Sequence, residues 1–418
     1  MSPRDKGSFD RLLLPDILLW LMPGLKRLII FLSVFTAILA LAYGYTAYRL
    51  LPFSTMANSL KIVAITAIVF CILLGPLSQI IRIYYEESPL SDAVAWIAYV
   101  SFGFFSMALF FVIVRDIGLG VYDIASSALL SSSRIADLAA ERLHWINTLN
   151  VSILAVTVGL TVYGFFMSRG KIRIHRLAVP IENLPADLKG FTIAQISDLH
   201  VGPTIKEGFV RRVVEMVNDL APDMIAVTGD LVDGSVPRLR KHVAPLADLN
   251  SRYGTFYVTG NHEYYSGALP WIGEVKRLGM TVLLNEHRMV GPAASPIALG
   301  GITDYTAGGF IASHRSDPEK AFQGSPEGAV RILLAHQPKS VFAAAKEGVA
   351  LQLSGHTHGG QYFPGNLFVP LQQPFVKGLH RFENTQIFVH TGTGYWGPPI
   401  RVGTSAEIAL IRLVAAGD

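Results

Sequence analysis

Cysteine and charged residues are scarce in this 418-residue sequence. The one cysteine, Cys71, lies within an apolar run, so an intramolecular disulfide is impossible and neither a cysteine-based metal site nor thiol catalysis is expected. Charged residues make up 16% of the chain, against roughly 25% in typical globular proteins. Because the net charge is only +4 and the basic residues are spread along the chain, we expect no nucleic-acid partner. The sequence does not indicate an obligate protein partner either.

Hydrophobic residues instead reach 51%, and much of that share lies in four long runs in the first half of the chain. Each run has the about 20 residues needed to cross a bilayer core, with its charges at the ends. Buried helices of a large soluble core are the alternative, but such helices rarely run this long without a charge. We therefore predict four transmembrane helices that anchor the chain and contact membrane lipids. The runs are Leu28–Tyr48, Ile62–Ile83, Ala93–Val114 and Ile146–Met167.

Two shorter segments accompany these runs. Leu12–Met22 is too short to cross a bilayer and is broken by Pro15 and Pro23, so we expect an interfacial helix there. Ser132–Trp145 alternates apolar and charged residues at helical spacing, which is typical of an amphipathic helix on a membrane. A cleaved signal peptide is an alternative for the first long run, although three further runs favour a retained anchor. The predicted organisation is an N-terminal interfacial segment (1–27), a four-helix transmembrane anchor (28–170) and a soluble domain (171–418).

Basic residues beside the runs predict the orientation in the membrane. A chain that crosses the membrane four times returns to the side where it began, so both flanks of the helical region lie on one side. That side has about twice as many lysines and arginines as the other. The positive-inside rule then puts the soluble domain in the cytoplasm, with a bacterial inner membrane as the expected location. No ionisable residue lies deep within a run, which favours an anchor over a transporter. The richer side has Arg4, Lys6, Arg11, Lys26, Arg27, Arg82, Arg169, Lys171, Arg173 and Arg176, and the other has Arg49, Lys61, Arg115, Arg134 and Arg142.

Beyond Arg176, short β-rich runs alternate with helical stretches and turns, the pattern of an α/β domain. Helices are predicted over Ile205–Leu220, Gly267–Leu278 and Pro338–Glu347. Five of the predicted strands end at polar residues able to bind metal, and loops that follow strands carry the function of α/β folds. The predicted strands are Thr192–Ser197, Met224–Thr228, Thr255–Thr259, Thr281–Leu284, Ile297–Gly300, Ala329–Ala335, Leu351–Ser354, Gln386–His390 and Glu407–Leu413.

Histidine, aspartate and asparagine residues gather at these five strand ends. Imidazole together with carboxylate suits divalent Zn, Fe or Mn. His336 alone, or Asp198 with His200 alone, would more often be ordinary residues, whereas the runs Gly260–Glu263 and Gly355–His358 are stronger signals. The whole set at strand ends favours a metal site. Two cations about 3.5–4 Å apart need a bridging carboxylate, and such a pair activates a water and holds phosphate oxygens. Asp230 is the expected bridge. The set comprises Asp198 and His200, Asp230 and Asp233, Asn261 and His262, His336, and His356 and His358.

One further motif is rejected. Gly392–Gly397 fits G-x-G-x-x-G after a strand, but a dinucleotide site would need a helix to begin there. Pro398 and Pro399 oppose that helix, so we predict a loop.

Read in order, the strand-end residues form the series D-x-H, G-D-x-x-D, G-N-H-E, H and G-H-x-H. This series resembles the calcineurin-like metallophosphoesterase superfamily, over roughly Phe191–Leu413. The stretch Gly355–Gln361 and the tail Gly392–Glu407 look like its bacterial membrane-anchored branch. The resemblance implies an α/β four-layer sandwich, in which two β-sheets pack together between helices. It also implies a metal-dependent hydrolase of phosphodiester or pyrophosphate bonds that uses a metal-activated hydroxide.

The resemblance further implies a role for each motif residue. Two divalent ions are expected, Mn, Zn or Fe rather than Mg. His262 would contact the phosphate and protonate the leaving oxygen or stabilise its charge, and Asp233 would orient His262 or a metal ligand. The implied ligands are Asp198, His200 and His358 for the first ion, Asp230 as the bridge, and Asn261, His336 and His356 for the second.

The chain departs from the family at Gly234, where many relatives have an arginine that contacts phosphate. A protein substrate is therefore less expected, and Arg401, together with Tyr395, is predicted to contact the substrate instead. Loops near the site are rich in aromatic residues, which either pack ordinarily or form an apolar rim for a lipid-linked substrate; UDP-2,3-diacylglucosamine is one candidate, because pyrophosphatases for it belong to this superfamily. A catalytically inactive membrane scaffold or sensor is the alternative, although all seven ligand positions are intact. The aromatic residues are Tyr264, Tyr265, Tyr362, Phe363, Phe368, Tyr395 and Trp396.

Overall fold

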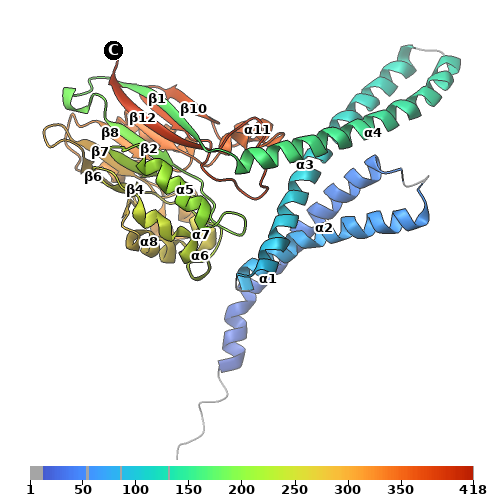
Figure 1. Cartoon of the computed structure of the whole chain (residues 1–418), viewed down its shortest axis with the longest axis horizontal. Helices are drawn as coiled ribbons and strands as arrows, with labels where there is room; N and C mark the ends of the chain where they lie inside the picture. Colours follow the sequence, from blue (N-terminus) through green and yellow to red (C-terminus); the bar gives the residue numbers. More distant parts are fainter. Residues whose placement is uncertain (1–12, 53–55, 85–86, 130–131, 418) are drawn as a thin grey trace, which may run out of the picture.

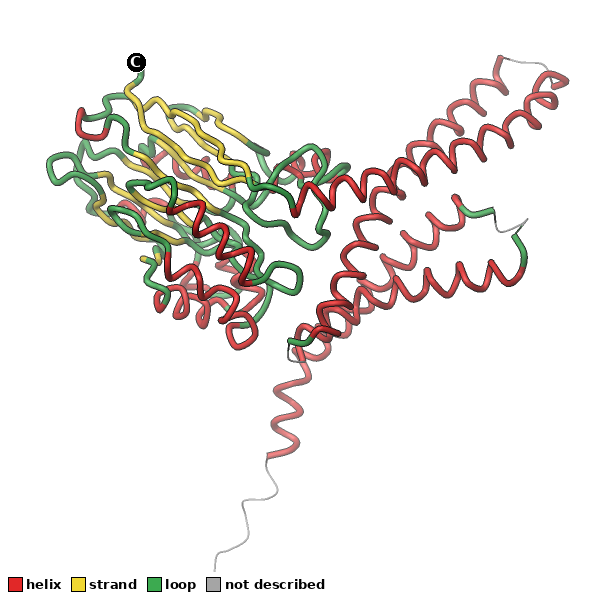
Figure 2. The backbone as a smooth tube through the Cα atoms, in the orientation of Figure 1, coloured by secondary structure: helices red, strands yellow, loops and turns green. Residues whose placement is uncertain are grey.

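The computed structural model describes residues 13–52, 56–84, 87–129 and 132–417. Four long helices make up the first part of the chain and an α/β domain the second (Figure 1). Figure 2 shows every strand within the second part, where two sheets lie among shorter helices. The predicted fold class, a helical membrane region followed by an α/β domain, is confirmed.

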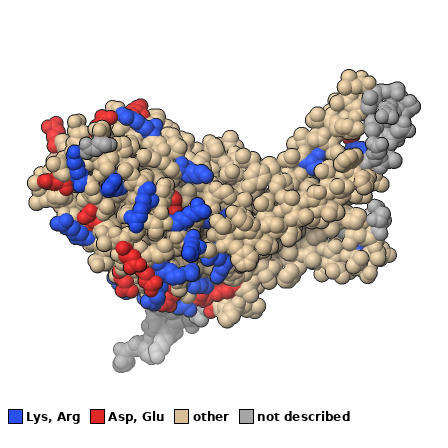
Figure 3. All heavy atoms as spheres, turned by 45° about the horizontal axis from the view of Figure 1, so that its top comes forward, with Lys and Arg blue, Asp and Glu red and all other residues tan. Residues whose placement is uncertain are grey.

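Each of the four long helices contains a stretch that is long and apolar enough to cross a membrane. The stretches are Leu28–Leu50, Asn58–Ile81, Pro89–Leu129 and Arg142–Arg169. Acidic and basic side chains gather on the α/β domain, whereas the helix surface visible in Figure 3 has few of them. The helices are α1 (Leu13–Leu50), α2 (Asn58–Tyr84), α3 (Pro89–Leu129) and α4 (Ser132–Arg169).

The helices are longer than their apolar runs predict. α1 continues through Pro15 and Pro23 instead of breaking into a separate interfacial helix; the residues before Leu13 lie outside the described part of the chain. Pro15 stands in the first turn, where a helix needs no N–H, and proline is tolerated in membrane helices. The expected amphipathic helix Ser132–Trp145 is the first part of α4.

A paired charge cluster lets α3 continue past the end of its predicted run. Asp116 Oδ1 accepts hydrogen bonds from Arg49 of α1 and from Arg115, each at 2.7 Å. Arg115 also donates to the side-chain oxygen of Asn150 on α4. Because each charge finds a partner, the cluster joins three helices without leaving an isolated ion.

The first sheet of the domain has the strand order β1-β12-β2-β3-β4-β5. β2, β3, β4 and β5 pair in parallel, β12 runs antiparallel to β2, and β1 pairs in parallel with β12. All four residues of β3 are buried, as expected for a parallel strand covered on both faces. The bounds are β1 Arg173–Ile181, β2 Thr192–Ile196, β3 Met224–Val227, β4 Thr255–Tyr257, β5 Thr281–Val282 and β12 Glu407–Ala415.

The second sheet has the order β10-β11-β9-β8-β7-β6. Its four central strands are parallel, and its two edge strands, β10 and β6, are antiparallel to their neighbours. The bounds are β6 Glu286–Val290, β7 Ile297–Gly301, β8 Arg331–Leu334, β9 Leu351–Ser354, β10 Gly378–Phe382 and β11 Thr385–Val389.

The two sheets pack face to face, and helices cover their outer faces. Ile193 and Ala226 of the first sheet share one buried cluster with Leu334 and Leu353 of the second. A second cluster lies between the first sheet and α5, α6 and α8, and a third lies between the second sheet and α9 and α10. The predicted four layers are therefore present. The remaining helices are α5 Glu207–Asn218, α6 Val236–Val243, α7 Asn261–Ser266, α8 Ala268–Arg277, α9 Pro318–Phe322, α10 Val341–Ala344 and α11 Gly365–Phe368.

The domain packs directly on α3 and α4. Gly103 of α3 and Gly164 of α4 both face Ile400, and a Cβ at either glycine would overlap the Ile400 side chain. Ser168 near the end of α4 donates a hydrogen bond of 2.7 Å to the carbonyl of Pro399. The loop before β12 therefore seats the domain against the helices at two glycines, both beside the Ile400 side chain.

Candidate metal centre

The polar residues that follow five strands meet at one edge of the two sheets. Asp198 and His200 follow β2, Asp230 follows β3, and His336 follows β8. Neighbouring parallel strands end at the same edge of a sheet, so the loops after them converge. The remaining residues come from the same edge: Asn261 and His262 begin α7 just after β4, and His356 and His358 follow β9.

Asp198, His200 and His358 form the first group with metal-binding geometry. The two imidazoles face each other, with 3.0 Å between His200 Nε2 and His358 Nε2. Asp198 Oδ1 lies 3.5 Å from His358 Nε2. All three side chains are buried, where an ionised carboxylate needs a partner of opposite charge.

Asp230, His336 and His356 form the second group. His336 Nε2 lies 3.2 Å from both Asp230 Oδ2 and His356 Nδ1. Asp230 Oδ2 is also 3.8 Å from His200 Nε2 in the first group. Asp230 therefore lies between the two groups, the position that a bridging carboxylate requires.

Asn261 contributes a buried amide oxygen without a protein partner. Among the described residues, nothing donates a hydrogen bond to its Oδ1. A buried acceptor left unsatisfied costs about 1–3 kcal/mol, so a ligand at this position is favoured. Oxygen and nitrogen donors of this kind are suitable ligands for divalent Zn, Fe or Mn.

Five of these residues have a strained backbone. Asp198, His200, Asp230, His356 and His358 have φ values of 54°, 49°, 51°, 71° and 50°, in the left-handed region that side chains disfavour. Such strain costs on the order of 1–3 kcal/mol per residue and gathers at functional sites. The fold therefore holds these side chains in place at a local cost in stability.

Glycines give the strand ends room to approach one another. At Gly229, φ is +88° and a Cβ would lie 2.9 Å from His336 Nδ1. Gly260 has an ordinary φ, but a Cβ there would overlap the carboxylate of Asp230. Close packing, as well as backbone angle, therefore requires glycine beside these residues.

His262 lies beside two carboxylates and forms a further group of possible ligands with His200 and Asp233. Its Nδ1 is 2.5 Å from Asp233 Oδ1, and its Nε2 is 3.9 Å from Asp230 Oδ2. Burial lowers the pKa of His262, but Asp230 and Asp233 outweigh burial and raise the pKa to about 9. Burial and the neighbouring His336 lower the pKa of His356 to about 3. His262 is thus suited to carry a proton and His356 to offer a free nitrogen.

Glu263 is a structural member of the site for which the sequence predicted no role. Its carboxylate accepts hydrogen bonds from the backbone N–H groups of Gly260 at 2.7 Å, Leu231 at 2.7 Å and Asp230 at 3.1 Å. It therefore ties the end of β4 to the end of β3. The G-N-H-E run was the available signal, because a glutamate fully buried at this point needs several donors.

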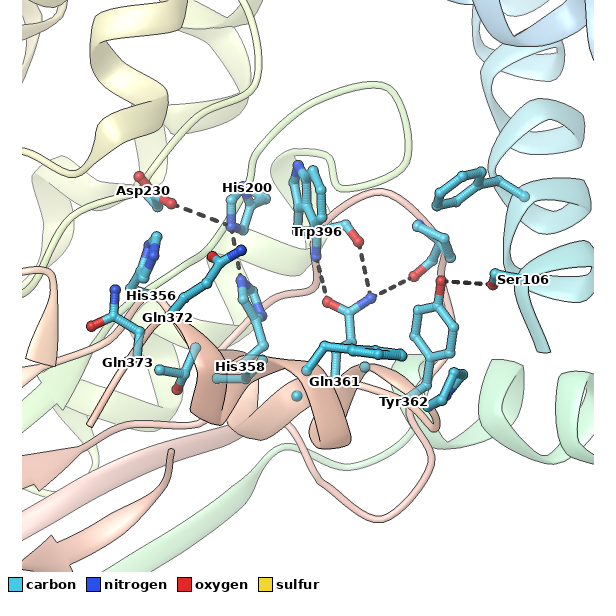
Figure 4. A pocket seen from close by; sticks show the side chains of 18 of the residues that line it. Ser106, His200, Asp230, His356, His358, Gln361, Tyr362, Gln372, Gln373 and Trp396 are labelled. Carbon is cyan, nitrogen blue, oxygen red and sulfur yellow. Dashed lines mark hydrogen bonds and ion pairs between the residues drawn. The ribbon is translucent and has the colours of Figure 1, made fainter. Parts of the chain in front are cut away.

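A cavity of about 620 Å³ opens onto both groups. Figure 4 shows Asp230, His200, His356 and His358 at one end and, across the cavity, Tyr362 reaching Ser106 of α3. Four of the seven aromatic residues singled out in the sequence line this cavity, namely Tyr265, Tyr362, Phe368 and Trp396. Phe363 instead packs on Phe110 and Phe111 of α3, whereas Tyr264 and Tyr395 are buried.

Arg401 and Tyr395, the two residues predicted to bind substrate, do not line the cavity. Arg401 is 0% exposed, and its guanidinium donates to the carbonyls of Thr391, Gly392 and Gly394. Tyr395 is 3% exposed and donates to the carbonyl of Thr204. The hydrogen bonds of both side chains run to atoms that do not line the cavity, so the structure does not bring these two predicted residues to it. Gly392–Gly397, in contrast, is a loop as predicted.

Comparisons with known proteins agree with the geometry. A sequence profile described as calcineurin-like phosphoesterase matches residues 191–360. A zebrafish (Danio rerio) protein named as a transmembrane protein with metallophosphoesterase domain is 36% identical over 332 residues, which cover 77% of this chain and 74% of the relative. A cattle (Bos taurus) protein of the same name is 38% identical over 272 residues, which cover 62% of this chain and 61% of the relative.

Similarity extends to bacterial proteins. A Helicobacter pylori protein named as an uncharacterized metallophosphoesterase is 37% identical over 286 residues, which cover 68% of this chain and 75% of the relative. The matches to the zebrafish and H. pylori proteins are longer than the 170 or so residues of the profile and therefore include sequence outside it.

Proposed function

Because the chain belongs to the calcineurin-like metallophosphoesterase family, we propose that it is a membrane-anchored hydrolase of phosphodiester or pyrophosphate bonds that uses two divalent metal ions. The observation that carries this proposal is the position of Asp230, within 3.2 Å of His336 and 3.8 Å of His200. One carboxylate thereby touches both groups of ligand-type side chains, which is the arrangement that two neighbouring cations need.

The proposed ligands divide between the two groups. Neutral imidazole and carboxylate are the donors, so Mn, Zn or Fe suits the site better than Mg, which prefers oxygen and water. Ions held here supply Lewis-acid chemistry, which activates a water and stabilises charge on phosphoryl oxygens. Asp198, His200 and His358 are proposed for one ion, Asn261, His336 and His356 for the other, and Asp230 for both.

His262 and Asp233 are the proposed proton-handling pair. Hydrolysis joins a water oxygen to phosphorus and breaks the bond from phosphorus to the leaving oxygen, which must take up a proton. His262 lines the cavity, and the carboxylates beside it raise its pKa to about 9, so it carries that proton at neutral pH. Asp233 accepts from Nδ1 of His262 and leaves Nε2 to face the substrate.

The cavity favours a substrate that brings an apolar part. No lysine or arginine is among the described residues that line it, so the charge of the phosphate would be met by the metal ions and His262. Aromatic side chains at the rim include Trp396, which is 53% exposed, and Phe368, which is 55% exposed. We therefore propose a lipid-linked phosphodiester or pyrophosphate, with UDP-2,3-diacylglucosamine as a candidate. Equal turnover of that lipid and of a water-soluble diester in detergent would exclude the lipid preference.

We also propose that the domain lies on the cytoplasmic side of a bacterial inner membrane. Lys26, which precedes the first span, and Arg169, which ends the fourth, belong to the more basic side by sequence. A reporter enzyme that is active only outside the cytoplasm, fused after Asp418, should stay inactive. A strong signal from that fusion would reverse the assignment.

Purified full-length protein in detergent provides the direct test. We expect about two metal ions per chain, hydrolysis of bis-p-nitrophenyl phosphate, loss of activity with a chelator, and recovery with Mn, Zn or Fe more than with Mg. The alternative is an inactive membrane scaffold or sensor. A protein that folds normally, is purified without metal and hydrolyses no diester after Mn, Zn, Fe or Mg is added would support that alternative.

A further inference from the structure

The cavity at the metal centre has a second wall, formed by a membrane helix. The residues that α3 contributes fall at positions 102, 106, 109, 110 and 113, the spacing of a single helix face. Apart from one serine they are apolar. The cavity is therefore polar where the ligand-type residues stand and apolar where α3 covers it. The α3 residues are Phe102, Ser106, Leu109, Phe110 and Ile113.

This wall lies within the bilayer-spanning stretch of α3. Ser91, near the start of the helix, contacts Arg238 of the domain, and Arg115 belongs to the charge cluster shared with α1 and α4. At about 1.5 Å per residue, Ser106 is about 22 Å along the axis from Ser91 and about 14 Å from Arg115. The hydrocarbon core of a bilayer is about 30 Å thick, so the apolar wall stands at the depth of acyl chains.

One domain loop is fastened to α3 at that same level. The hydroxyls of Tyr362 and Ser106 are 3.1 Å apart, and the ring centroids of Phe363 and Phe110 are 4.7 Å apart. The cavity wall is thus continuous from the ligand-type residues, through this loop, to the helix (Figure 4).

Exposed apolar side chains lie in and beside the lining of the cavity. On the domain, Phe368 lines the cavity and is 55% exposed, and Leu367, next to it in the chain, is 51% exposed. On α3, Ile113 lines the cavity and is still 41% exposed. Large apolar side chains gathered beside a membrane helix indicate a surface that faces lipid.

Resting on the hydrolase activity proposed above, we infer that α3 is the chain-binding wall of the substrate site. A lipid phosphoester reaches the cavity sideways from the bilayer, its phosphate lies at the metal centre, and its acyl chain lies along the α3 face defined above. The volume of about 620 Å³ is within the range of small-molecule sites. The membrane helices then determine substrate specificity in addition to anchoring the domain.

Alkyl p-nitrophenyl phosphates with chains from methyl to dodecyl test this directly, in full-length protein held in mixed micelles. For the unaltered protein, kcat/KM should rise by about tenfold or more from the shortest to the longest chain, since each buried methylene favours binding. Ile113→Trp, which fills the apolar end, should remove that rise.

Val114→Trp is the matched control, because Val114 is the next residue, is 50% exposed and does not line the cavity. It should keep the dependence on chain length. Leu109→Trp gives a second, independent block of the apolar end. Hydrolysis without any chain-length dependence, or identical behaviour of Ile113→Trp and Val114→Trp, overturns the role of α3 but leaves the hydrolase proposal standing. Failure of the unaltered, metal-loaded protein to hydrolyse any of the esters overturns both.

Discussion

Asp233 Oδ1 lies 2.5 Å from His262 Nδ1, closer than its 3.1 Å approach to His200 Nδ1. Asp233 is buried, and although burial alone would raise its pKa, His200 and His262 lower it well below the usual range. The carboxylate is therefore ionised at neutral pH. It fixes which nitrogen of His262 faces the cavity.

Asp233→Asn should reduce kcat by about 10–100-fold, as removal of a residue that orients an active-site histidine commonly does. It should also move the alkaline limb of the pH profile to lower pH. The pKa of His262 is raised to about 9 by Asp230 and Asp233 against the effect of burial, so loss of one carboxylate lowers it. The measurement is the dependence of kcat/KM on pH. Asp219→Asn, an exposed aspartate at the end of α5, is the control, and an unmoved alkaline limb would contradict the assignment.

Asp230→Asn should remove both metal binding and activity. The amide keeps the size of the side chain but loses the charge that would hold two cations, so metal content should fall from about two ions per chain to one or fewer. Elemental analysis of the purified variant measures this. Retention of two ions would show that Asp230 is not the bridge, even if activity were lost.

The strands that were not predicted from the sequence share one kind of position in the sheets. β1, β6 and β10 were not predicted, and each stands at the edge of its sheet. Edge strands are covered less completely, so fewer of their side chains are buried: β10 has no buried residue, whereas all four residues of β9 are buried. Strands buried on both faces carry a continuous apolar signal, which explains why the central strands could be read from the sequence.

The ligand-type residues were predictable because polar side chains directly after buried strands are costly without a partner. Asp198 and His336 needed no information beyond their own strands. Nothing local in the sequence reveals that the guanidinium of Arg401 donates inward to carbonyls of its own loop. The part played by α3 was equally hidden, since it depends on contacts such as Ser106 with Tyr362, which are 256 residues apart.

Glu263→Ala should destabilise the domain, because three backbone N–H groups would lose their acceptor together. An unsatisfied buried donor costs about 1–3 kcal/mol, and we expect a loss of about 3 kcal/mol or more in total. Glu263→Gln keeps one acceptor oxygen, so its stability should lie between that of the unaltered protein and that of Glu263→Ala. Thermal unfolding in detergent measures the order. Glu215→Ala, exposed on α5, is the control; equal stability of the two alanine variants would rule out the structural role.

Glu87, between α2 and α3, joins the helices to the domain. It pairs with Lys206, with Lys241 at 2.9 Å and with His242 at 2.8 Å. Glu87→Gln should lower stability by about 1 kcal/mol, as for a partly buried ion pair. The control is Glu207→Gln, whose pair with Arg211 is largely exposed and should matter little.

The effect of Glu87→Gln should depend on pH in a defined direction. Partial burial would raise the pKa of Glu87, but hydrogen bonds from Lys206, Lys241 and His242 outweigh it and lower the pKa from 4.5 to about 2. A depressed carboxyl pKa gives stability that is fully present above the unfolded value and is lost as the carboxylate gains a proton. The difference in thermal midpoint between the unaltered protein and the variant should stay constant from pH 8 to 6 and shrink below about pH 4.5. A difference that grows as the pH falls would contradict this role.

Arg401→Lys should act on stability and leave substrate affinity unchanged. The guanidinium is fully buried, and burial lowers its pKa to about 10, so it remains charged at neutral pH while donating to four backbone carbonyls. A lysine cannot reproduce that planar set of donors, and we expect a loss of about 3–5 kcal/mol, typical of a buried charge whose partners are disturbed. Arg412→Lys, exposed on β12, is the matched control.

At a temperature where Arg401→Lys is still folded, its KM for bis-p-nitrophenyl phosphate should stay within about twofold of normal, because Arg401 does not reach the cavity. A raised KM with unchanged thermal stability would support the sequence-based prediction that Arg401 contacts the phosphate.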